Sequence, residues 1–395
     1  MKHVVIAGGG FAGVRLARKL RSRKDVRVTL INNSPDFRYY PAMYRAATGY
    51  KMGASRVALE WMLLNSSNID IVIDSVVSND TQKKELLLAS GKTIGYDYVV
   101  FALGSVTTYF NVEGLHEHSF GIKSPEEILT LRAHLHGKVV GNSPEQYNYV
   151  VVGAGPTGVE LAGSLGSYLQ HIAKKHRRRN HKITLWLVEA APRVVPQLGE
   201  SASRRVKKRL EKLGVKILTD TKVEAETINE LRTSTGPIKS HTVIWTAGTA
   251  LNPFFAQSVE DFPLGEHKRV KVGEHFDVNP VTYVVGDNAS TKFSGLAYTA
   301  IKDADFVADD ICRRIAGKSR KARVDHRPVS VVPTGRGWAV LQYGSLVLSG
   351  WLMSLVRGAA DLIGYVDVMG VMRGLTIWSN SELTEDGCTI CHRSK

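Results

Sequence analysis

The chain has 395 residues, of which 43% are hydrophobic and 23% charged, so a largely disordered chain is excluded and two or three folded domains are expected. The formal net charge of +15 indicates an anionic neighbour, such as nucleic acid, an anionic membrane surface or a phosphorylated substrate, or else only a basic solvated surface. Three cysteines exclude a disulfide framework and favour a reducing compartment, and we expect no export signal because the chain enters an apolar run at once.

The chain opens with a predicted strand, glycine turn and helix, "HVVIAGGGFAGVRLARKL" at residues 3–20. Gly8, Gly10 and Gly13 form the pattern G-x-G-x-x-G. The first glycine permits a tight turn, the second lets a pyrophosphate approach the backbone, and the third allows close helix–strand packing. The helix N-terminus then offers free N–H groups to phosphates. The pattern predicts a dinucleotide site, although glycine turns also have purely structural roles.

A second predicted strand, "VRVTLINN", ends at Asn32 and Asn33. Dinucleotide sites usually place an Asp or Glu here, to accept a hydrogen bond from a ribose hydroxyl. An asparagine amide can accept the same bond but has no charge. We therefore expect nucleotide binding without the usual carboxylate.

The same construction returns in "VVVGAGPTGVELAG" at residues 150–163, where Gly153, Gly155 and Gly158 repeat the spacing. The strand that follows ends at Glu189. A carboxylate there accepts from an adenosine 2′-hydroxyl and repels a 2′-phosphate, which predicts a preference for NADH over NADPH. The alternative is an exposed glutamate at a strand end. Two phosphate cradles suggest two dinucleotides, FAD at the first and NAD(H) at the second, as in a hydride relay.

The C-terminal part contains an uncharged stretch at residues 337–356, which we interpret as a strand, a turn and a helix beginning near Gly350. An apolar face along the helix and the next segment suggests an interfacial surface that lies on a membrane without crossing it. The competing interpretation is a core helix or a dimer face. The tail matches C-x-x-C-H at Cys388 and Cys391; incidental cysteines are favoured over haem, a redox dithiol or half of a zinc site completed by His275 or by another subunit.

Four further segments of the chain form a recognisable series in sequence order: "FRYYPAMYRAATG" (37–49), "YDYVVFALGS" (96–105), "VIWTAGTALNP" (243–253) and "TYVVGDNA" (282–289). Together with the two glycine turns, they resemble the type II NADH dehydrogenases, the NADH:quinone oxidoreductases of the FAD-dependent pyridine nucleotide-disulfide oxidoreductase superfamily. The disulfide reductases and sulfide:quinone reductases share this architecture but need redox cysteines, and no cysteine precedes Cys312. The resemblance implies an α/β fold with two Rossmann-like dinucleotide-binding domains, the NAD domain inserted in the FAD domain, and a small amphipathic C-terminal region.

The resemblance also implies roles for particular residues. Asp287 would lie on the ribityl chain, and the helix whose N-terminus is expected near residues 295–297 would point at the pyrimidine edge of the flavin. Glu160 would lie where nicotinamide and flavin meet and relay a proton or orient the nicotinamide, the alternative being stabilisation of its own helix. Where similar enzymes have Gln residues at the quinone site, this chain has Tyr298 and Lys302, which can stack on a quinone ring and bind a carbonyl.

The complete set of predicted site residues follows from these motifs and from the resemblance. The catalytic candidates are Glu160, Tyr298 and Lys302. The cofactor-binding candidates are Gly8, Gly10, Phe11, Ala12, Gly13, Asn32, Asn33, Thr48, Val76, Ala102, Gly104, Gly153, Gly155, Pro156, Thr157, Gly158, Glu189, Gly248, Gly286, Asp287, Leu296 and Ala297. No metal site is expected.

The predicted domains are residues 1–110 and 255–330 for FAD, 111–254 for NAD(H), and 331–395 for membrane association or dimerisation. The predicted function is hydride transfer from NADH to FAD and then two electrons to a membrane quinone, without proton pumping. The alternatives are an NADH-binding flavoprotein sensor or assembly factor of the apoptosis-inducing type, or an NADH reductase with a non-quinone acceptor. We expect a cytoplasmic protein bound peripherally to the anionic inner face of the cell membrane, with a homodimer as a further expectation and no specific nucleic-acid partner.

Overall fold

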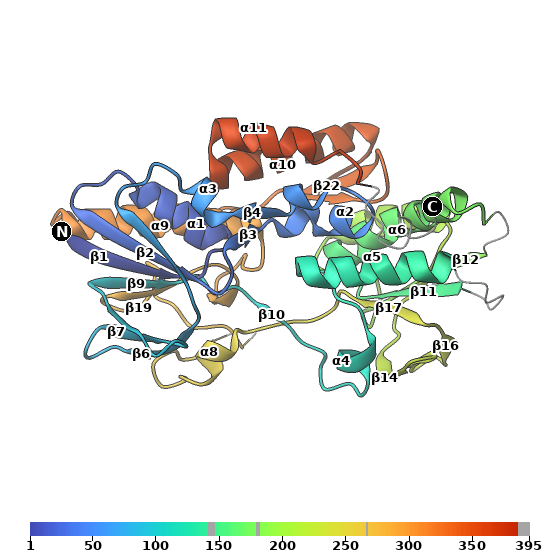
Figure 1. The fold of residues 1–395 in the computed structure, drawn as a ribbon, viewed down its shortest axis with the longest axis horizontal. Helices are drawn as coiled ribbons and strands as arrows, with labels where there is room; N and C mark the ends of the chain where they lie inside the picture. Colours follow the sequence, from blue (N-terminus) through green and yellow to red (C-terminus); the bar gives the residue numbers. More distant parts are fainter. Residues whose placement is uncertain (141–146, 179–181, 266–267, 386–395) are drawn as a thin grey trace.

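The computed structural model describes residues 1–140, 147–178, 182–265 and 268–385. Its first layer is a six-stranded sheet in the order β19-β20-β9-β1-β2-β5 (Figure 1). The five strands from β20 to β5 run parallel, and β19 pairs antiparallel with β20. The strands are β1 (Lys2–Ala7), β2 (Val26–Asn32), β5 (Ile69–Ile73), β9 (Tyr98–Phe101), β19 (Asp277–Asn279) and β20 (Thr282–Val284).

Two helices, α1 (Phe11–Leu20) and α9 (Ala297–Ile315), lie side by side on one face of this sheet (Figure 1). The sheet's apolar strands are buried on both faces; β1, for example, has four fully buried residues from Val4 to Ala7. The other face is covered by the antiparallel sheet β6 (Val76–Asp80), β7 (Glu85–Leu88) and β8 (Thr93–Gly95), with α8 (Pro253–Ala256) beside it. Short elements between β2 and β5 are β3 (Asp36–Arg38), α2 (Met43–Ala47), β4 (Arg56–Ala58) and α3 (Leu59–Met62).

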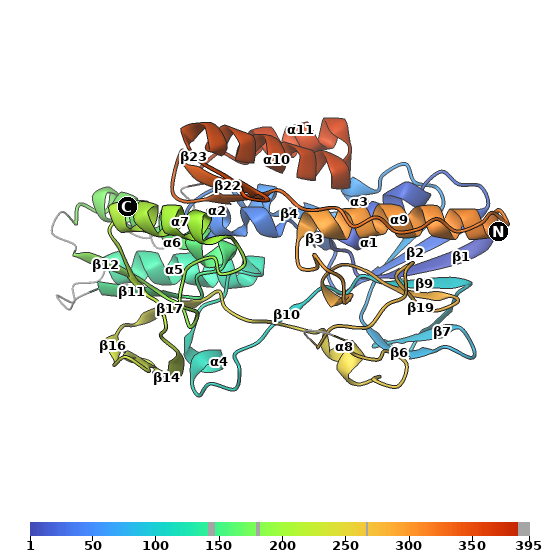
Figure 2. The same cartoon turned by 180° about the vertical axis from the view of Figure 1, so that it is seen from behind.

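A second, four-stranded parallel sheet has the order β13-β12-β11-β17. Helices α5 (Pro125–Val140) and α6 (Pro156–Lys175) cover one face, with α7 (Glu200–Lys212) beside them (Figure 2). The other face meets α4 (Leu115–His118) and an antiparallel sheet of three short strands. The four-stranded sheet consists of β11 (Tyr147–Val152), β12 (Ile183–Val188), β13 (Val215–Leu218) and β17 (Thr242–Trp245). The three-stranded sheet consists of β14 (Val223–Thr227), β15 (Glu230–Thr233) and β16 (Ile238–Lys239).

The second sheet is inserted in the sequence between strands of the first, which are drawn from residues 2–101 and 277–284. Two antiparallel crossings, β10 (Val106–Thr107) and β18 (Thr249–Ala250), join the two halves (Figure 1). The predicted fold class is therefore confirmed; the predicted domain boundaries stay a prediction.

The C-terminal part forms a third layer across both halves (Figures 1 and 2). A three-stranded antiparallel sheet, β21 (Ser330–Pro333), β22 (Ala339–Tyr343) and β23 (Leu346–Gly350), leads into α10 (Trp351–Met369) and α11 (Val371–Asn380). The predicted helix start near Gly350 is confirmed, but two strands precede it where one was predicted. In the described part of the chain, every helix is too short or too polar to span a bilayer.

Candidate functional site

The first glycine turn joins β1 to α1, and its three motif glycines have different surroundings. Gly8 has φ +111°, and a Cβ there would lie 2.3 Å from the carbonyl oxygen of Ala102. A Cβ on Gly13 would lie 1.8 Å from the carbonyl oxygen of Gly8. By contrast, nothing lies within 4 Å of a Cβ built on Gly10. Packing thus explains the first and third glycines, whereas the second leaves backbone open to an incoming group, which fits a pyrophosphate.

The end of β2 completes this first cradle. The Asn32 side-chain oxygen accepts a hydrogen bond from the N–H of Gly9 at 2.8 Å, and its amide nitrogen donates to the carbonyl of Ser34 at 2.7 Å. Asn33 is exposed. Val76 lies two residues after Asp74, whose N–H donates to the carbonyl of Asn32. The structure therefore places Asn32 at the turn, where its amide secures the glycine loop.

The second glycine turn, between β11 and α6, repeats the geometry of the first. Gly153 has φ +98°, with Ala247 2.8 Å from a built Cβ, and a Cβ on Gly158 would lie 1.8 Å from the carbonyl oxygen of Gly153. Gly155 again has nothing within 4 Å. Pro156 occupies the first turn of α6, and Thr157 beside it is exposed. The two turns are thus equivalent cradles, each with one open glycine.

Glu189 holds the position in the second cradle that Asn32 holds in the first. One of its carboxylate oxygens accepts from the N–H of Ala154 at 2.6 Å, and the other accepts from the N–H of Ala191 at 2.8 Å. Ala154 and Gly9 are the middle residues of the two glycine turns, so both strand ends hold the turn by the same type of bond. At this strand-end position the second cradle therefore has a carboxylate, whereas the first has an uncharged amide.

Further predicted flavin-site residues gather around the first turn. Gly286 has φ +72°, and a Cβ there would lie 3.9 Å from Ala12 at the start of α1. The hydroxyl of Ser105 donates to Asp287 at 2.9 Å, and the Asn288 amide donates to the carbonyl of Gly104 at 2.8 Å. Leu296 directly precedes α9 and Ala297 begins it. The structure thus brings residues 102–105, 286–288 and the α1 N-terminus together.

Three predicted cofactor residues lie in mainly structural environments. Thr48 is buried, and its hydroxyl donates to the carbonyls of Tyr44 and Arg45, so it closes the end of α2. Phe11 packs edge-on against Phe37 in the hydrophobic core. Gly248 has φ +72° and would place a Cβ 2.6 Å from the carbonyl of Thr108, so its packing serves the crossing between the two halves.

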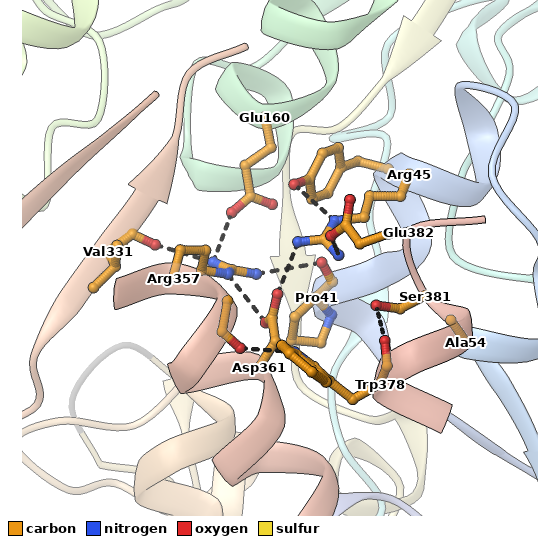
Figure 3. A network of polar contacts seen from close by, with 12 residues as sticks. Pro41, Arg45, Ala54, Glu160, Val331, Arg357, Asp361, Trp378, Ser381 and Glu382 are labelled. Atoms are coloured by element: carbon orange, nitrogen blue, oxygen red, sulfur yellow. Dashed lines mark hydrogen bonds and ion pairs between the residues drawn. The ribbon is translucent and has the colours of Figure 1, made fainter. Parts of the chain in front are cut away.

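Glu160 lies on α6 and is only 7% exposed. Arg357 of α10 donates a hydrogen bond to its carboxylate at 3.2 Å (Figure 3). The same guanidinium donates to the carbonyls of Val331 and Pro41 and to the carboxylate of Asp361. Burial raises the pKa of Glu160 to about 7, while the Arg357 charge opposes that rise. A carboxyl with this pKa can both hold and release a proton near neutral pH.

The polar network continues from Asp361 into the first half of the chain. Arg45 of α2 pairs with Asp361 at 2.9 Å and with Glu382 at 2.9 Å (Figure 3). The sequence analysis missed Arg357 as the partner of Glu160, and it missed Arg45 and Asp361 as members of the same network. The available signal was an Arg–Asp pair four residues apart on a largely apolar helix, because such a pair is buried only with partners.

Tyr298 and Lys302 lie one turn apart near the start of α9. Tyr298 is 43% exposed, and the Lys302 ammonium lies 5.6 Å from the centre of its ring, a cation–π contact. The next residue, Asp303, accepts from the N–H of Gly286 at 3.3 Å, and burial raises its pKa to about 7. Sequence reasoning missed Asp303. The predicted tail cysteines Cys388 and Cys391 lie outside the described residues.

Comparisons with known proteins agree with this geometry. The family model described as pyridine nucleotide-disulphide oxidoreductase matches residues 2–304. The type II NADH:quinone oxidoreductase Ndh of Mycobacterium tuberculosis is 30% identical over 92% of this chain and 84% of its own length. The chain also has the fold of NDH2 from Plasmodium falciparum in complex with NADH, with a TM-score of 0.84, 15% identity and coverage of 96% and 98% of the two chains.

A further structural match is the sulfide:quinone oxidoreductase of Aquifex aeolicus, with a TM-score of 0.79, 20% identity and coverage of 94% and 92% of the two chains. At such identities the structures establish the fold alone, whereas the family match and the 30% identical relative establish membership. The predicted family is therefore confirmed. The chain belongs to the pyridine nucleotide-disulphide oxidoreductase family, among the type II NADH:quinone oxidoreductases.

Proposed function

We propose that this chain is an FAD-dependent NADH:quinone oxidoreductase, a non-proton-pumping NADH dehydrogenase. The main support is the pair of equivalent glycine cradles, each with two packed glycines and one open glycine, in a chain 30% identical to such an enzyme. When bound, FAD accepts hydride from NADH and passes two electrons to a quinone. The protein's own residues bind both dinucleotides, orient them and manage protons.

The first cradle holds FAD. The open backbone at Gly10 and the N-terminus of α1 receive the pyrophosphate. Asn32 steadies the turn from the end of β2, and Asp287 takes the ribityl chain from the segment after β20. The N-terminus of α9 directs its positive end towards the flavin ring and stabilises negative charge there.

The second cradle holds NAD(H). Gly155 leaves room for the pyrophosphate, and Pro156 and Thr157 start the helix that faces it. Glu189 accepts from the adenosine 2′-hydroxyl and repels a 2′-phosphate, so NADH is preferred over NADPH. The residues of the crossings, including Gly248, set the position of the second half relative to the first.

Glu160 exchanges a proton near the junction of the two cofactors. Its carboxyl lies on the nicotinamide-side helix α6 and is held by Arg357 from the C-terminal layer. Tyr298 and Lys302 face the acceptor: the Tyr298 ring stacks on the quinone, and the Lys302 ammonium binds a carbonyl oxygen of the quinone. These two side chains replace the amides of similar enzymes, so the acceptor site is more aromatic and more cationic.

The C-terminal layer binds the membrane peripherally on its inner, anionic face. Its helices expose large apolar residues in the described chain: Trp351, Leu352, Leu355, Ile363, Val371 and Met372. An apolar face next to an overall net charge of +15 favours an anionic bilayer surface. In this arrangement residues 1–110 and 255–330 form the FAD domain, 111–254 the NAD(H) domain, and 331–395 the membrane-facing region.

The experiment is steady-state NADH oxidation by the purified protein with a water-soluble short-chain quinone. We expect turnover with NADH and quinone together and much slower turnover with NADPH. Absence of turnover in a preparation that contains FAD would overturn the proposal. Purified protein that cannot retain FAD would overturn the assignment of the first cradle.

A further inference from the structure

A cavity of about 740 Å³ lies in the second half of the molecule, where α4 and strand β14 meet the segment that follows β10 (Figure 1). Its wall is formed by residues from the range 107–118 and by Glu226 and Thr227. A cavity of this volume is typical of small-molecule sites. No residue of either glycine cradle lines it, so the proposed function leaves this cavity without a ligand.

Glu226 supplies a buried carboxyl group to the cavity wall. The residue is 5% exposed, and in the part of the chain that the structure describes its Oε2 atom has no hydrogen-bond partner. An ionised carboxylate is costly to bury without a partner, and burial raises the pKa of Glu226 to about 8. Since buried polar groups in folded proteins are nearly always paired, the missing partner is one that a ligand can supply.

The backbone holds Glu226 against the segment that precedes α4. Its N–H donates to the carbonyl of Glu113 at 2.9 Å. Gly114 has φ +79°, and a Cβ there would lie 1.9 Å from the carbonyl oxygen of Glu226. Only glycine allows this close contact between the two segments. The buried carboxyl therefore belongs to a closely packed wall of the cavity.

The cavity is acidic, although the chain as a whole has a formal net charge of +15. Glu113 and Glu117 line it at exposed positions, and its lining contains neither lysine nor arginine. The other titratable side chains are His116, His118 and Tyr109, whose ring meets the His116 ring edge-on at 5.5 Å. Among the described residues, no three His, Cys, Asp or Glu side chains are placed to hold a metal ion. Carboxylates beside an aromatic ring favour an organic cation instead.

From this arrangement we infer that the cavity binds a small organic cation with a primary ammonium group, which pairs with Glu226 while the Tyr109 ring packs on its alkyl part. The ammonium gives the buried carboxylate its missing partner. The exposed Glu113 and Glu117 attract the cation from solvent. Because Glu226 holds its proton at neutral pH and an adjacent cation favours the ionised form, binding releases that proton.

The test is calorimetric titration of the purified full chain, supplied with FAD, with putrescine as the probe. We expect saturable binding of one diamine per chain. At about pH 7, the heat should differ between two buffers of different ionisation enthalpy by an amount that corresponds to nearly one released proton. Butanediol, which has the same length and no charge, should not bind.

The decisive variant is Glu226→Gln. It should weaken putrescine binding by roughly tenfold or more, as expected when a charged hydrogen-bond partner is removed, and should abolish the proton release. Glutamine replaces a carboxyl group that is already uncharged at neutral pH, so the variant should unfold at a temperature no lower than the unchanged protein. Glu224→Gln, at an exposed position on the same strand, is the matched control and should bind as the unchanged protein does.

Absence of saturable putrescine binding, or equal affinity for the unchanged protein and Glu226→Gln, would overturn the inference. So would equal losses in Glu226→Gln and Glu224→Gln, because these would indicate a diffuse effect of charge. Binding of Zn²⁺ without binding of putrescine would assign the cavity to a metal ion. Displacement of putrescine by NADH would place the cavity within the second cradle, and this too would contradict a separate site.

Discussion

At the scale of single residues, the difference between the two cradles is one side chain at the same position. Asn32 and Glu189 each hold the turn of their cradle by accepting a backbone N–H, but only Glu189 adds a charge. Either residue can therefore hold the glycine turn in place. The carboxylate remains to discriminate between a ribose hydroxyl and a phosphate.

Replacement of Glu189 by Gln retains an acceptor for the turn and removes the charge. We expect kcat/KM for NADPH relative to NADH to rise by roughly tenfold, since a charge-assisted contact contributes about 1.5–3 kcal/mol. Steady-state kinetics with both nucleotides measure the ratio. Glu211→Gln, at an exposed site on α7, is the control. An unchanged ratio in Glu189→Gln would remove the basis for its assigned role.

Glu160 makes stability depend on pH in a defined direction. Its pKa is raised to about 7 from 4.5, so the folded state binds its proton more tightly than the unfolded state does. Its contribution to folding is complete below pH 4.5 and is lost as pH rises to 7. Relative to Glu160→Gln, the free energy of unfolding of the unchanged protein should therefore fall by up to ~3 kcal/mol across this window. Urea unfolding of both proteins at pH 4.5 and pH 8 measures this change. The same difference in free energy of unfolding between the two proteins at both pH values would contradict it.

At the scale of elements, different glycines of the same turn serve folding and cofactor binding. Gly13→Ala places a methyl group 1.8 Å from a backbone oxygen, so it should destabilise the fold, by an overpacking cost of roughly 1–3 kcal/mol or more. Gly10→Ala adds a methyl group where nothing lies within 4 Å. It should leave thermal stability of the FAD-free protein nearly unchanged and weaken FAD binding. Melting curves with and without FAD test both variants; equal FAD affinity for Gly10→Ala would refute the open-cradle interpretation.

The helices and strands differ in how well the sequence predicts them. The strand–turn–helix units were predictable because their signals, glycine spacing and an apolar run, are local. The positions of Asn32 and Glu189 were also predictable, because each lies at the end of the strand that follows one of these units in the chain. The role of α10 was only half predictable, because periodicity identifies its apolar face but not the partners of Arg357 and Asp361. Those partners, Glu160 and Arg45, come from α6 and α2, nearly 200 and more than 300 residues away in the chain.

At the scale of the whole molecule, the C-terminal layer connects the two nucleotide halves. Arg357 of α10 contacts Glu160 of the second half and the Pro41 carbonyl of the first, and Asp361 contacts Arg45 (Figure 3). Arg357→Gln removes the positive charge that lowers the pKa of Glu160, so that pKa should rise further. The pH dependence of unfolding should then extend to higher pH than in the unchanged protein. A pH dependence that does not move would show that the two charges are not coupled.

The most direct measurement is an anaerobic absorbance titration of the purified protein. The flavin band should bleach with one equivalent of NADH per bound FAD, should respond far less to NADPH, and should return when a quinone is added. Protein that is colourless after incubation with FAD, or a flavin band that NADH leaves unchanged, would contradict the assignment of two communicating dinucleotide sites to this chain.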